Sequence, residues 1–527
     1  MKTLKIVILL TLSFVSFTFT TQAQFFEDAL RFSRTRFGGS VRYQSIAGAG
    51  VALGGDISNA LSNPAGLGFS RRSEWSISPA LAFNNTTSDF FGESTDDSKL
   101  NMNISHLGAV FSKARNSLTA FKGGAFAITL TRVNDFQNKF AYEGTNPNNS
   151  IADFFQEEVH RRGVPYGFYL EEEDFGISEP HSLFYFTYLL NPVDNSDPNQ
   201  TEYYTFKNLA PNRQREEVTT KGAQYVINFS YGANFDDRFY IGGTVGVNTL
   251  RYERTRILSE TPENSVANDY PVNNLVYQVN QGMGGVGINA KIGMIYRPTD
   301  LVRFGFTATT PTVYRITDDY NASLFVQYNN FVFNDSIYQA EEYGRVGVGD
   351  NRNITLTNQN ASVALESFDY SLVTPYRLEG GVAFFIGKSG FISGDVEYVN
   401  YSSINLVANS ENDFATSQGV IDNEYQSALN FRVGGEYRWK LLRFRAGFAQ
   451  YGSPFKSFVN RDETRQFFTG GVGLRKKDFY LDLGVVAQKD KFSFAPYDIT
   501  NPDKFPNPGA DISHSKVQAI ISFGMFY

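Results

Sequence analysis

The segment Gln224–Gly232, with the sequence QYVINFSYG, places apolar and polar side chains alternately along the chain. One series contains Tyr225, Ile227, Phe229 and Tyr231, and the other contains Gln224, Asn228 and Ser230. A period of two residues is typical of a β-strand with one apolar face. The pair Asp236-Asp237 predicts a tight turn, after which 239–250 returns with the same alternation. The stretch therefore predicts a β-hairpin.

The same pattern recurs along the rest of the chain. We expect strands at 74–84, 101–112, 123–133, 222–235, 238–253, 282–297, 301–316, 375–387, 390–402, 425–438, 441–451, 465–476, 478–488 and 514–527. Alternating segments of about ten residues are typical of membrane β-barrels, whose even strand number leaves both chain ends on one side. The sequence therefore predicts an all-β fold, a 14-stranded antiparallel transmembrane β-barrel over residues 74–527.

The connections between the expected strands alternate in length. Short ones, such as 236–238 and 388–389, alternate with long ones, of which 134–221 and 317–374 are the longest. Outer-membrane barrels combine short periplasmic turns with long extracellular loops. The last expected strand ends in an aromatic residue, Tyr527, which resembles the signal read by the barrel-assembly machinery. We therefore expect the chain in the outer membrane of a Gram-negative bacterium, in contact with membrane lipid and lipopolysaccharide.

The N-terminus and the composition agree with export. Residues 1–23 combine a short basic segment, an apolar run and a final Ala, which predicts a secretory signal peptide. The 527-residue chain has no Cys, so disulfides and Cys-ligated metals are excluded. Its formal net charge of −7 argues against a nucleic-acid partner, because such partners select basic surfaces.

Residues 24–73 precede the first expected strand and have a different character. They contain a run of small residues, 47–55, and a turn at Asn63, Pro64, Ala65 and Gly66. A barrel of fourteen strands encloses more space than its own side chains fill. We therefore expect residues 24–73 to fold into the lumen as a plug, or hatch, with an ordinary extension below the barrel as the alternative.

The signal peptide, the Gly-rich segment with its Asn-Pro-Ala turn and the fourteen strands together resemble the FadL family of outer-membrane long-chain fatty acid transporters. The resemblance implies passive transport of hydrophobic compounds without a cofactor. It also implies capture of the ligand among the outer loops and passage to a pocket inside the barrel. The ligand then leaves sideways, at a kink in the third strand, when the N-terminus of the plug shifts. Here that strand begins at Gly123 and Gly124, which could accommodate a kink.

One outer connection contains a clear helix signal at 150–163. Ser150 and Asp153 form a capping box, and Ile151, Phe154, Phe155 and Val159 fall on one face. On the transport interpretation this apolar face captures ligand. The alternative is that it packs on neighbouring loops as a lid.

The inward face of the expected barrel is divided between small and charged residues. Strands three to seven point small side chains inward, which is where a cavity is expected. Strands eight to eleven point charges inward, and Arg432, Arg443 and Arg445 are candidates to bind a ligand carboxylate. The alternative is a ladder of opposite charges that braces the wall and anchors the plug.

Other chemistries find little support in the sequence. The GxGxxG match at 282–287 opens a strand and precedes no helix, so a nucleotide loop is not expected. The four His have no metal-ligand spacing, and we expect neither a metal nor enzymatic activity. Two other functions stay open: a carrier barrel of the type IX secretion kind, which binds exported domains, and a diffusion pore for polar solutes. We expect a monomer.

Overall fold

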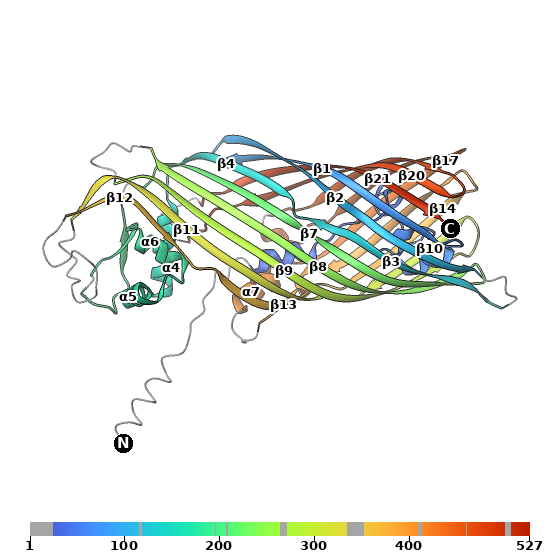
Figure 1. Cartoon of the computed structure of the whole chain (residues 1–527), viewed down its shortest axis with the longest axis horizontal. Helices are drawn as coiled ribbons and strands as arrows, with labels where there is room; N and C mark the ends of the chain where they lie inside the picture. Colours follow the sequence, from blue (N-terminus) through green and yellow to red (C-terminus); the bar gives the residue numbers. More distant parts are fainter. Residues whose placement is uncertain are drawn as a thin grey trace, which may run out of the picture.

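The computed structural model describes residues 25–114, 119–194, 196–206, 209–263, 271–334, 353–408, 414–459, 461–500 and 507–527. The predicted signal peptide lies outside them. The described chain forms a closed antiparallel barrel (Figure 1). Strand β1 (Glu74–Phe90) pairs with β2 (Glu93–Ala114) on one side and with β21 (Ala510–Phe526) on the other, which closes the ring. The predicted fold class is confirmed.

Fourteen wall positions follow one another around the ring. After β1 and β2 they are β3 (Phe121–Asp135) with β4 (Asn138–Asn146), β7 (Asn212–Phe235), β8 (Phe239–Pro262), β9 (Val272–Tyr296), β10 (Val302–Thr309) with β11 (Val313–Asn334), β12 (Asn353–Ser362) with β13 (Glu366–Val373) and β14 (Arg377–Ile386), β15 (Gly390–Asn400) with β16 (Asn405–Val407), β17 (Ser427–Trp439), β18 (Leu442–Tyr451), β19 (Arg465–Arg475), β20 (Phe479–Phe494) and β21. Interrupted positions explain why the main sheet has 19 named strands.

The quoted hairpin folds as predicted. Strands β7 and β8 pair from Phe235–Phe239 outward, and Asp236 and Asp237 both have φ 53°, as a type I′ turn requires. Phe229 and Tyr231 are 43% and 48% exposed, whereas Gln224 on the opposite face is buried. An apolar exterior around a polar interior is the arrangement that a lipid-facing barrel needs. Within the described residues no helix is both long and apolar enough to span a bilayer.

The two ends of the barrel differ, and we call them the turn end and the loop end. The strands extend further toward the loop end than predicted: 212–221, 254–262 and 272–281 were expected in loops and are strand. In these extensions polar and apolar residues are mixed on both faces, because the strands lie beyond the apolar band. An apolar alternation therefore could not reveal them.

The loop end carries a compact helical unit, which we call the outer cap. It consists of α4 (Ile151–Arg162), α5 (Tyr166–Phe175), α6 (Pro180–Phe186) and the small hairpin β5 (Leu190–Pro192) and β6 (Tyr203–Thr205). Its core includes Leu183, Phe184 and Tyr185 and packs against the strand extensions, for example at Leu258 and Leu324. Figure 1 shows the cap beneath β11 and β12. A further helix, α7 (Ala415–Glu424), lies on another loop.

The segment before β1 lies inside the barrel (Figure 1), in agreement with the expected plug. It contains α2 (Phe25–Ser33), α3 (Val41–Gln44) and the 3₁₀ helices η1 (Ile57–Ala60) and η2 (Pro64–Phe69). Two short 3₁₀ helices, η4 (Tyr401–Ser403) and η5 (Ser457–Val459), belong to outer loops.

The inward residues of β8 show the order of layers along the lumen. Tyr240 stacks on Phe69 of the plug at the turn end. Thr244 and Asn248 line a cavity. Tyr252 packs with α2, and Leu258 reaches the outer cap. Plug, cavity, α2 and outer cap thus follow one another toward the loop end.

Candidate functional site

The side chain of Asn63 connects the plug turn to the rest of the plug and to the wall. Asn63 accepts a hydrogen bond from the backbone N–H of Ala65 at 3.1 Å and thereby caps η2. Its Nδ2 donates to the carbonyl of Val51 at 2.7 Å and to that of Met294 in β9 at 3.1 Å. Since both bonds are made from a buried amide, the turn has a fixed position against the barrel.

The wall is shaped to receive this turn. A Cβ added to Gly242 on β8 would lie 2.4 Å from the carbonyl carbon of Pro64 and 2.5 Å from the backbone nitrogen of Ala65. Only glycine permits so close a backbone approach. Lys291 on β9 adds a charged contact, because its Nζ donates to the carbonyls of Leu61 and, at 3.1 Å, Ser62.

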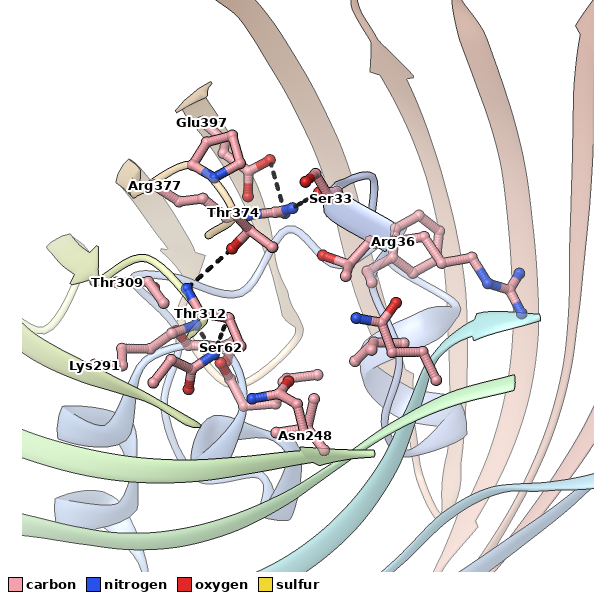
Figure 2. Close-up of a pocket in the computed structure, with 18 of the residues that line it drawn as sticks. Ser33, Arg36, Ser62, Asn248, Lys291, Thr309, Thr312, Thr374, Arg377 and Glu397 are labelled. Atoms are coloured by element: carbon pink, nitrogen blue, oxygen red, sulfur yellow. Dashed lines mark hydrogen bonds and ion pairs between the residues drawn. The ribbon is translucent and has the colours of Figure 1, made fainter. Parts of the chain in front are cut away.

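Above the plug turn lies a cavity of about 100 Å³ (Figure 2). Its lining comes from the plug, from β3, β7, β8, β9, β10, β11, β14, β15, β17 and β18, and from the connections beside β10 and β14. Most of its side chains are polar, and they include Arg36, Asn248, Lys291, Thr312, Arg377 and Glu397. A water occupies about 30 Å³ in the liquid, so the cavity holds a few waters or a small polar group.

Charges of both signs meet at this cavity. Arg432 lies 3.4 Å from Glu379 and 3.8 Å from Glu397, and Arg377 lies 3.8 Å from Glu397. Arg377 also donates to the carbonyl of Ser33 at 2.5 Å, so it ties α2 to the wall (Figure 2). These pairs brace β14, β15 and β17, as expected for inward charges on neighbouring strands.

The three predicted carboxylate contacts have different positions. Arg432 lines the cavity, where its Nε and Nη2 make no hydrogen bond to any described residue. Arg445 is bound at 2.8 Å to Glu436 and at 2.8 Å to Asp482, nearer the turn end. Arg443 donates to the carbonyls of Lys440 and Leu442 beside the β17–β18 turn. The structure brings only Arg432 to the cavity.

Helix α2 covers the cavity on the side of the loop end. Phe32 and Ser33 line the cavity, and Phe32 is fully buried in edge-to-face contact with Phe136 and Tyr252. Phe25 contacts Tyr370 and Phe414 in the same way. The cavity is therefore enclosed at both ends by the N-terminal segment.

The wall beside the cavity contains a break in its backbone ladder. Strand β2 pairs with β3 only from Ala114–Gly123 to His106–Thr131. Beyond this point, among the described residues, 93–105 of β2 pair with β1 alone and β4 pairs with β7 alone. Thr86 of β1, an inward-facing residue, donates to the carbonyl of Lys139, so β4 runs along the inner side of β1 and β2. We call this unpaired stretch the ladder break.

A bulge on β3 and an unusual glycine conformation on β7 lie at the start of the break. The register of β3 against β7 shifts between Arg132 and Asn134, so Val133 is the extra residue. On β7, Gly222 has φ +110°, a value that L residues rarely adopt. Its carbonyl accepts from the Phe136 N–H at 3.2 Å. Val133 also lines the cavity.

The glycines predicted to accommodate a kink lie elsewhere on β3. Gly123 has φ +126° and lies at a second register shift against β7, near the turn end. Gly123 and Gly124 nevertheless keep their pairing to Ala114 and Lys113 of β2. A local irregularity exists at Gly123, but the ladder to β2 ends only at Thr131. Their part in any wall opening stays a prediction.

The helix predicted for ligand capture forms, and its apolar face is occupied. The capping box of Ser150 and Asp153 is present. Ile151, Phe155 and Val159 are buried in the core of the outer cap, and Phe154 packs against it. This is the packing described by the alternative, a lid. A capture role would need the cap to open, and it stays a prediction.

Several site residues escaped the sequence analysis. Lys291 follows Asn289 in the inward series of β9, so continuing that series by one step would have found it. Arg36 lies in the plug, where no periodicity shows direction. Among the described residues no group of three possible metal ligands lies together.

Comparisons with known proteins agree with this geometry. No family profile and no curated protein matches the sequence. A FadL homologue of Pseudomonas aeruginosa is 12% identical, with a TM-score of 0.50 over 93% of this chain and 99% of that one. The toluene transporters TodX of P. putida and TbuX of Ralstonia pickettii are 12% and 15% identical, both with TM-scores of 0.48. They match over 93% and 94% of this chain and 99% and 100% of their own. The match to the P. aeruginosa homologue shows that the chain has the FadL-type barrel fold, as predicted.

Proposed function

We propose that this protein is a passive transporter of hydrophobic or amphiphilic compounds in the outer membrane of a Gram-negative bacterium. One observation carries the proposal: a cavity in the lumen lies directly beside the ladder break, with Val133 belonging to both. The turn end then faces the periplasm and the loop end faces the outside. The resemblance of the plug turn and strand pattern to the FadL family supports the same function.

The proposed route begins at the outer cap and ends in the membrane. Cargo passes the cap, displaces α2, enters the cavity and leaves through the ladder break. Side chains close the wall at the break, so an exit there needs no backbone hydrogen bond to be broken. The terminal strand would be read by the assembly machinery during insertion, and lipid and lipopolysaccharide would surround a monomer.

Buried apolar side chains hold α2 over the cavity in the closed state. Burying a Phe or Leu side chain contributes about 1.5–3 kcal/mol. Phe25, Leu30 and Phe32 of α2 are all buried, which corresponds to roughly 6 kcal/mol in total. Helix α2 therefore stays in place in the absence of cargo, and cargo must supply comparable contacts to replace it.

A diffusion pore for polar solutes is the second candidate, because the cavity lining is mainly polar. The two functions differ in conductance. A pore would conduct small ions continuously, whereas the proposed transporter has plug and α2 in the path.

The test measures both properties on one preparation. Purified protein is reconstituted in planar bilayers for conductance and in vesicles for transfer of dodecanoate and toluene. We expect a conductance near that of the empty bilayer and transfer of at least one probe above protein-free vesicles. Sustained ohmic conductance without probe transfer would favour the pore. Neither conductance nor transfer would count against both, and would leave the carrier function for exported domains to be tested by protein capture.

A further inference from the structure

Four connections at the turn end lie next to one another on the rim of the barrel. They join strands that follow one another around the ring, from β14 through β15, β17, β18, β19, β20 and β21 to β1. The connections are the link from the plug to β1 and three turns: 70–73, 387–389, 440–441 and 476–478. The C-terminus marked in Figure 1 lies at the same end.

Cations dominate the exposed charges of these four connections. Asp478 is their one exposed acidic side chain, and the exposed basic ones are Arg71, Arg72, Lys388, Lys440, Lys476 and Lys477. Arg71 points to the neighbouring β7–β8 turn, where it lies 3.7 Å from Asp237. We call the other five cations the basic arc. Since the whole chain has a formal net charge of −7, the positive excess of the basic arc is local.

The cations of the basic arc have no acidic partner in the part of the chain that the structure describes. Arg72 donates to the carbonyl of Lys477, which ties the link to the β19–β20 turn without neutralising either residue. No carboxylate of a described residue lies within salt-bridge distance of any of the five. Positive charge remains in excess even when Asp478 and the terminal carboxylate of Tyr527 are counted against the arc.

The turns on the other side of the rim differ, because their charges are balanced. The β7–β8 turn has two Asp beside Arg238, and the β9–β10 connection has Asp300 beside Arg297. Arg71 and Arg297 form ion pairs there, with Asp237 and Asp300. The free positive charge is therefore confined to one side of the rim.

Aromatic side chains place the basic arc at the surface of the membrane. Lys440 Nζ lies 5.7 Å from the centroid of the Trp439 ring, and Lys476 Nζ lies 5.3 Å from that of Phe479. Trp439 is 52% exposed on the outward face of β17. Membrane barrels carry aromatic girdles at both membrane surfaces. The two lysines therefore lie at the level of the lipid head groups.

We propose that the basic arc binds the head groups of acidic phospholipids in the membrane leaflet at the turn end. The inference goes beyond the proposed function, because it requires only that the barrel spans a membrane and involves no cargo. The phosphate of such a lipid accepts charge-assisted hydrogen bonds from Lys and Arg. An acidic soluble protein is the competing occupant. The lipid is favoured because Lys440 and Lys476 lie over rings on the lipid-facing side of the wall.

The chain contains a local probe of this surface. Trp75 and Trp439 are its two tryptophans, so Trp75→Phe leaves Trp439, beside Lys440, as the sole indole. The Trp75→Phe protein is reconstituted in phosphatidylcholine vesicles with increasing fractions of brominated phosphatidylglycerol or brominated phosphatidylcholine. Quenching of Trp439 fluorescence then gives the affinity of phosphatidylglycerol relative to phosphatidylcholine at the basic arc.

Three double variants in this background separate charge from place. Lys440→Gln with Lys476→Gln removes two cations of the basic arc, and Lys440→Arg with Lys476→Arg keeps their charge. The matched control is Lys113→Gln with Arg238→Gln, which removes two exposed cations on the other side of the rim. Migration of unheated samples in gels checks that each barrel is folded.

We expect phosphatidylglycerol to bind about 20-fold better than phosphatidylcholine in the Trp75→Phe protein at low ionic strength. Each cation near an anionic surface contributes about fivefold, so the double Gln variant should bring the ratio below about threefold. The double Arg variant and the control should keep the ratio of the parent protein. Raising the salt concentration should lower that ratio, because surface charges are screened.

A ratio near one in the parent protein would overturn the proposal and leave the basic arc to an acidic soluble partner. An equal loss in the control would overturn it too, because the preference would then belong to the whole rim. Transfer of dodecanoate and toluene in vesicles of pure phosphatidylcholine tests the proposed function without acidic lipid. Failure of transfer therefore counts against the proposed function alone, and failure of the quenching ratio counts against the basic arc alone.

Discussion

At the scale of single residues, the place of an inward-facing arginine along the barrel decides whether it reaches the cavity. Arg432 and Arg445 both point into the barrel, yet Arg432 reaches the cavity while Arg445 is enclosed between Glu436 and Asp482. Arg445 donates to both carboxylates at 2.8 Å, whereas Arg432 lies 3.4 Å from Glu379 and 3.8 Å from Glu397 and keeps two nitrogen atoms without a hydrogen bond to any described residue. Arg432 therefore remains the candidate among the predicted arginines, and Lys291 joins it.

Gly222 provides the first prediction. Alanine at φ +110° is strained, and its Cβ would lie 2.1 Å from the carbonyl oxygen of Arg251. We expect Gly222→Ala to lower the free energy of unfolding by about 1–3 kcal/mol and to alter transfer through the ladder break. Urea unfolding in vesicles measures the first effect. Gly284→Ala, at a glycine whose added Cβ meets open space, is the control; equal stability of the two variants would contradict the prediction.

Glu260 gives a prediction about pH. It lies on β8 beyond Leu258, under the outer cap, and accepts hydrogen bonds from Ser150, the Ile151 N–H and Gln214. Burial raises its pKa to about 7, although these bonds oppose the rise. The folded cap therefore binds a proton that the unfolded segment releases near pH 4.5. Stability is greatest below that pH and falls until about pH 7, by up to about 3 kcal/mol.

Hydrogen exchange of the α4 amides between pH 4.5 and 8, corrected for intrinsic exchange, checks this expectation. Glu260→Gln removes the titrating group and keeps the side-chain shape, so its protection should vary less with pH. The same pH dependence in both proteins would show that another group is responsible.

At the scale of elements, α2 and α4 illustrate two uses of an apolar helix face. The face of α4 packs inside the outer cap, whereas α2 covers the cavity and is tied to the wall through the carbonyl of Ser33. Both faces are buried, so exposure does not separate a lid from a capture surface. The residues around each helix distinguish the two uses, because of these two helices only α2 touches the cavity.

Helix α2 provides the element-scale prediction. Phe32→Ala removes a fully buried ring between Phe136 and Tyr252, which should weaken the docking of α2 by about 3–5 kcal/mol. Amide exchange in α2 should accelerate by at least 100-fold, and probe transfer should rise. Phe26→Ala, on a half-buried ring of the same helix, is the control. Similar acceleration in both variants would mean that α2 frays without guarding the cavity.

At the scale of the whole molecule, plug and wall are matched surfaces. The added Cβ of Gly242 would collide with the backbone of Pro64 and Ala65, while that of its neighbour Gly243 would meet only one atom, at 3.9 Å. The Cβ positions of these two neighbouring glycines therefore point in different directions, and only that of Gly242 points at the plug.

We expect Gly242→Ala to dislodge the plug turn and to raise bilayer conductance well above that of wild type, and Gly243→Ala to leave it unchanged. Single-channel recording of both variants measures the effect. An unchanged conductance in Gly242→Ala would show that α2 or the outer cap, and not the plug turn, keeps the barrel closed.

The sequence by itself determined the features that depend on local pattern. Alternation along Gln224–Gly232 and its counterparts specified the wall and its lipid-facing side, and Asn63-Pro64 specified the plug turn. Strand extensions beyond the apolar band were missed because polar and apolar residues are mixed on both faces there.

The place where backbone pairing between wall strands stops, and the charged side chains that meet inside the barrel, follow from the tertiary structure alone. At the break, a bulge at Val133 on β3 and a positive φ at Gly222 on β7 coincide, although 136–211 separate the two strands in the sequence. Arg36 reaches the cavity only through the path of the plug. Periodicity shows which face of its strand a side chain occupies. The residue that this side chain meets inside the barrel depends on strands paired over hundreds of residues, and a local sequence pattern does not contain that information.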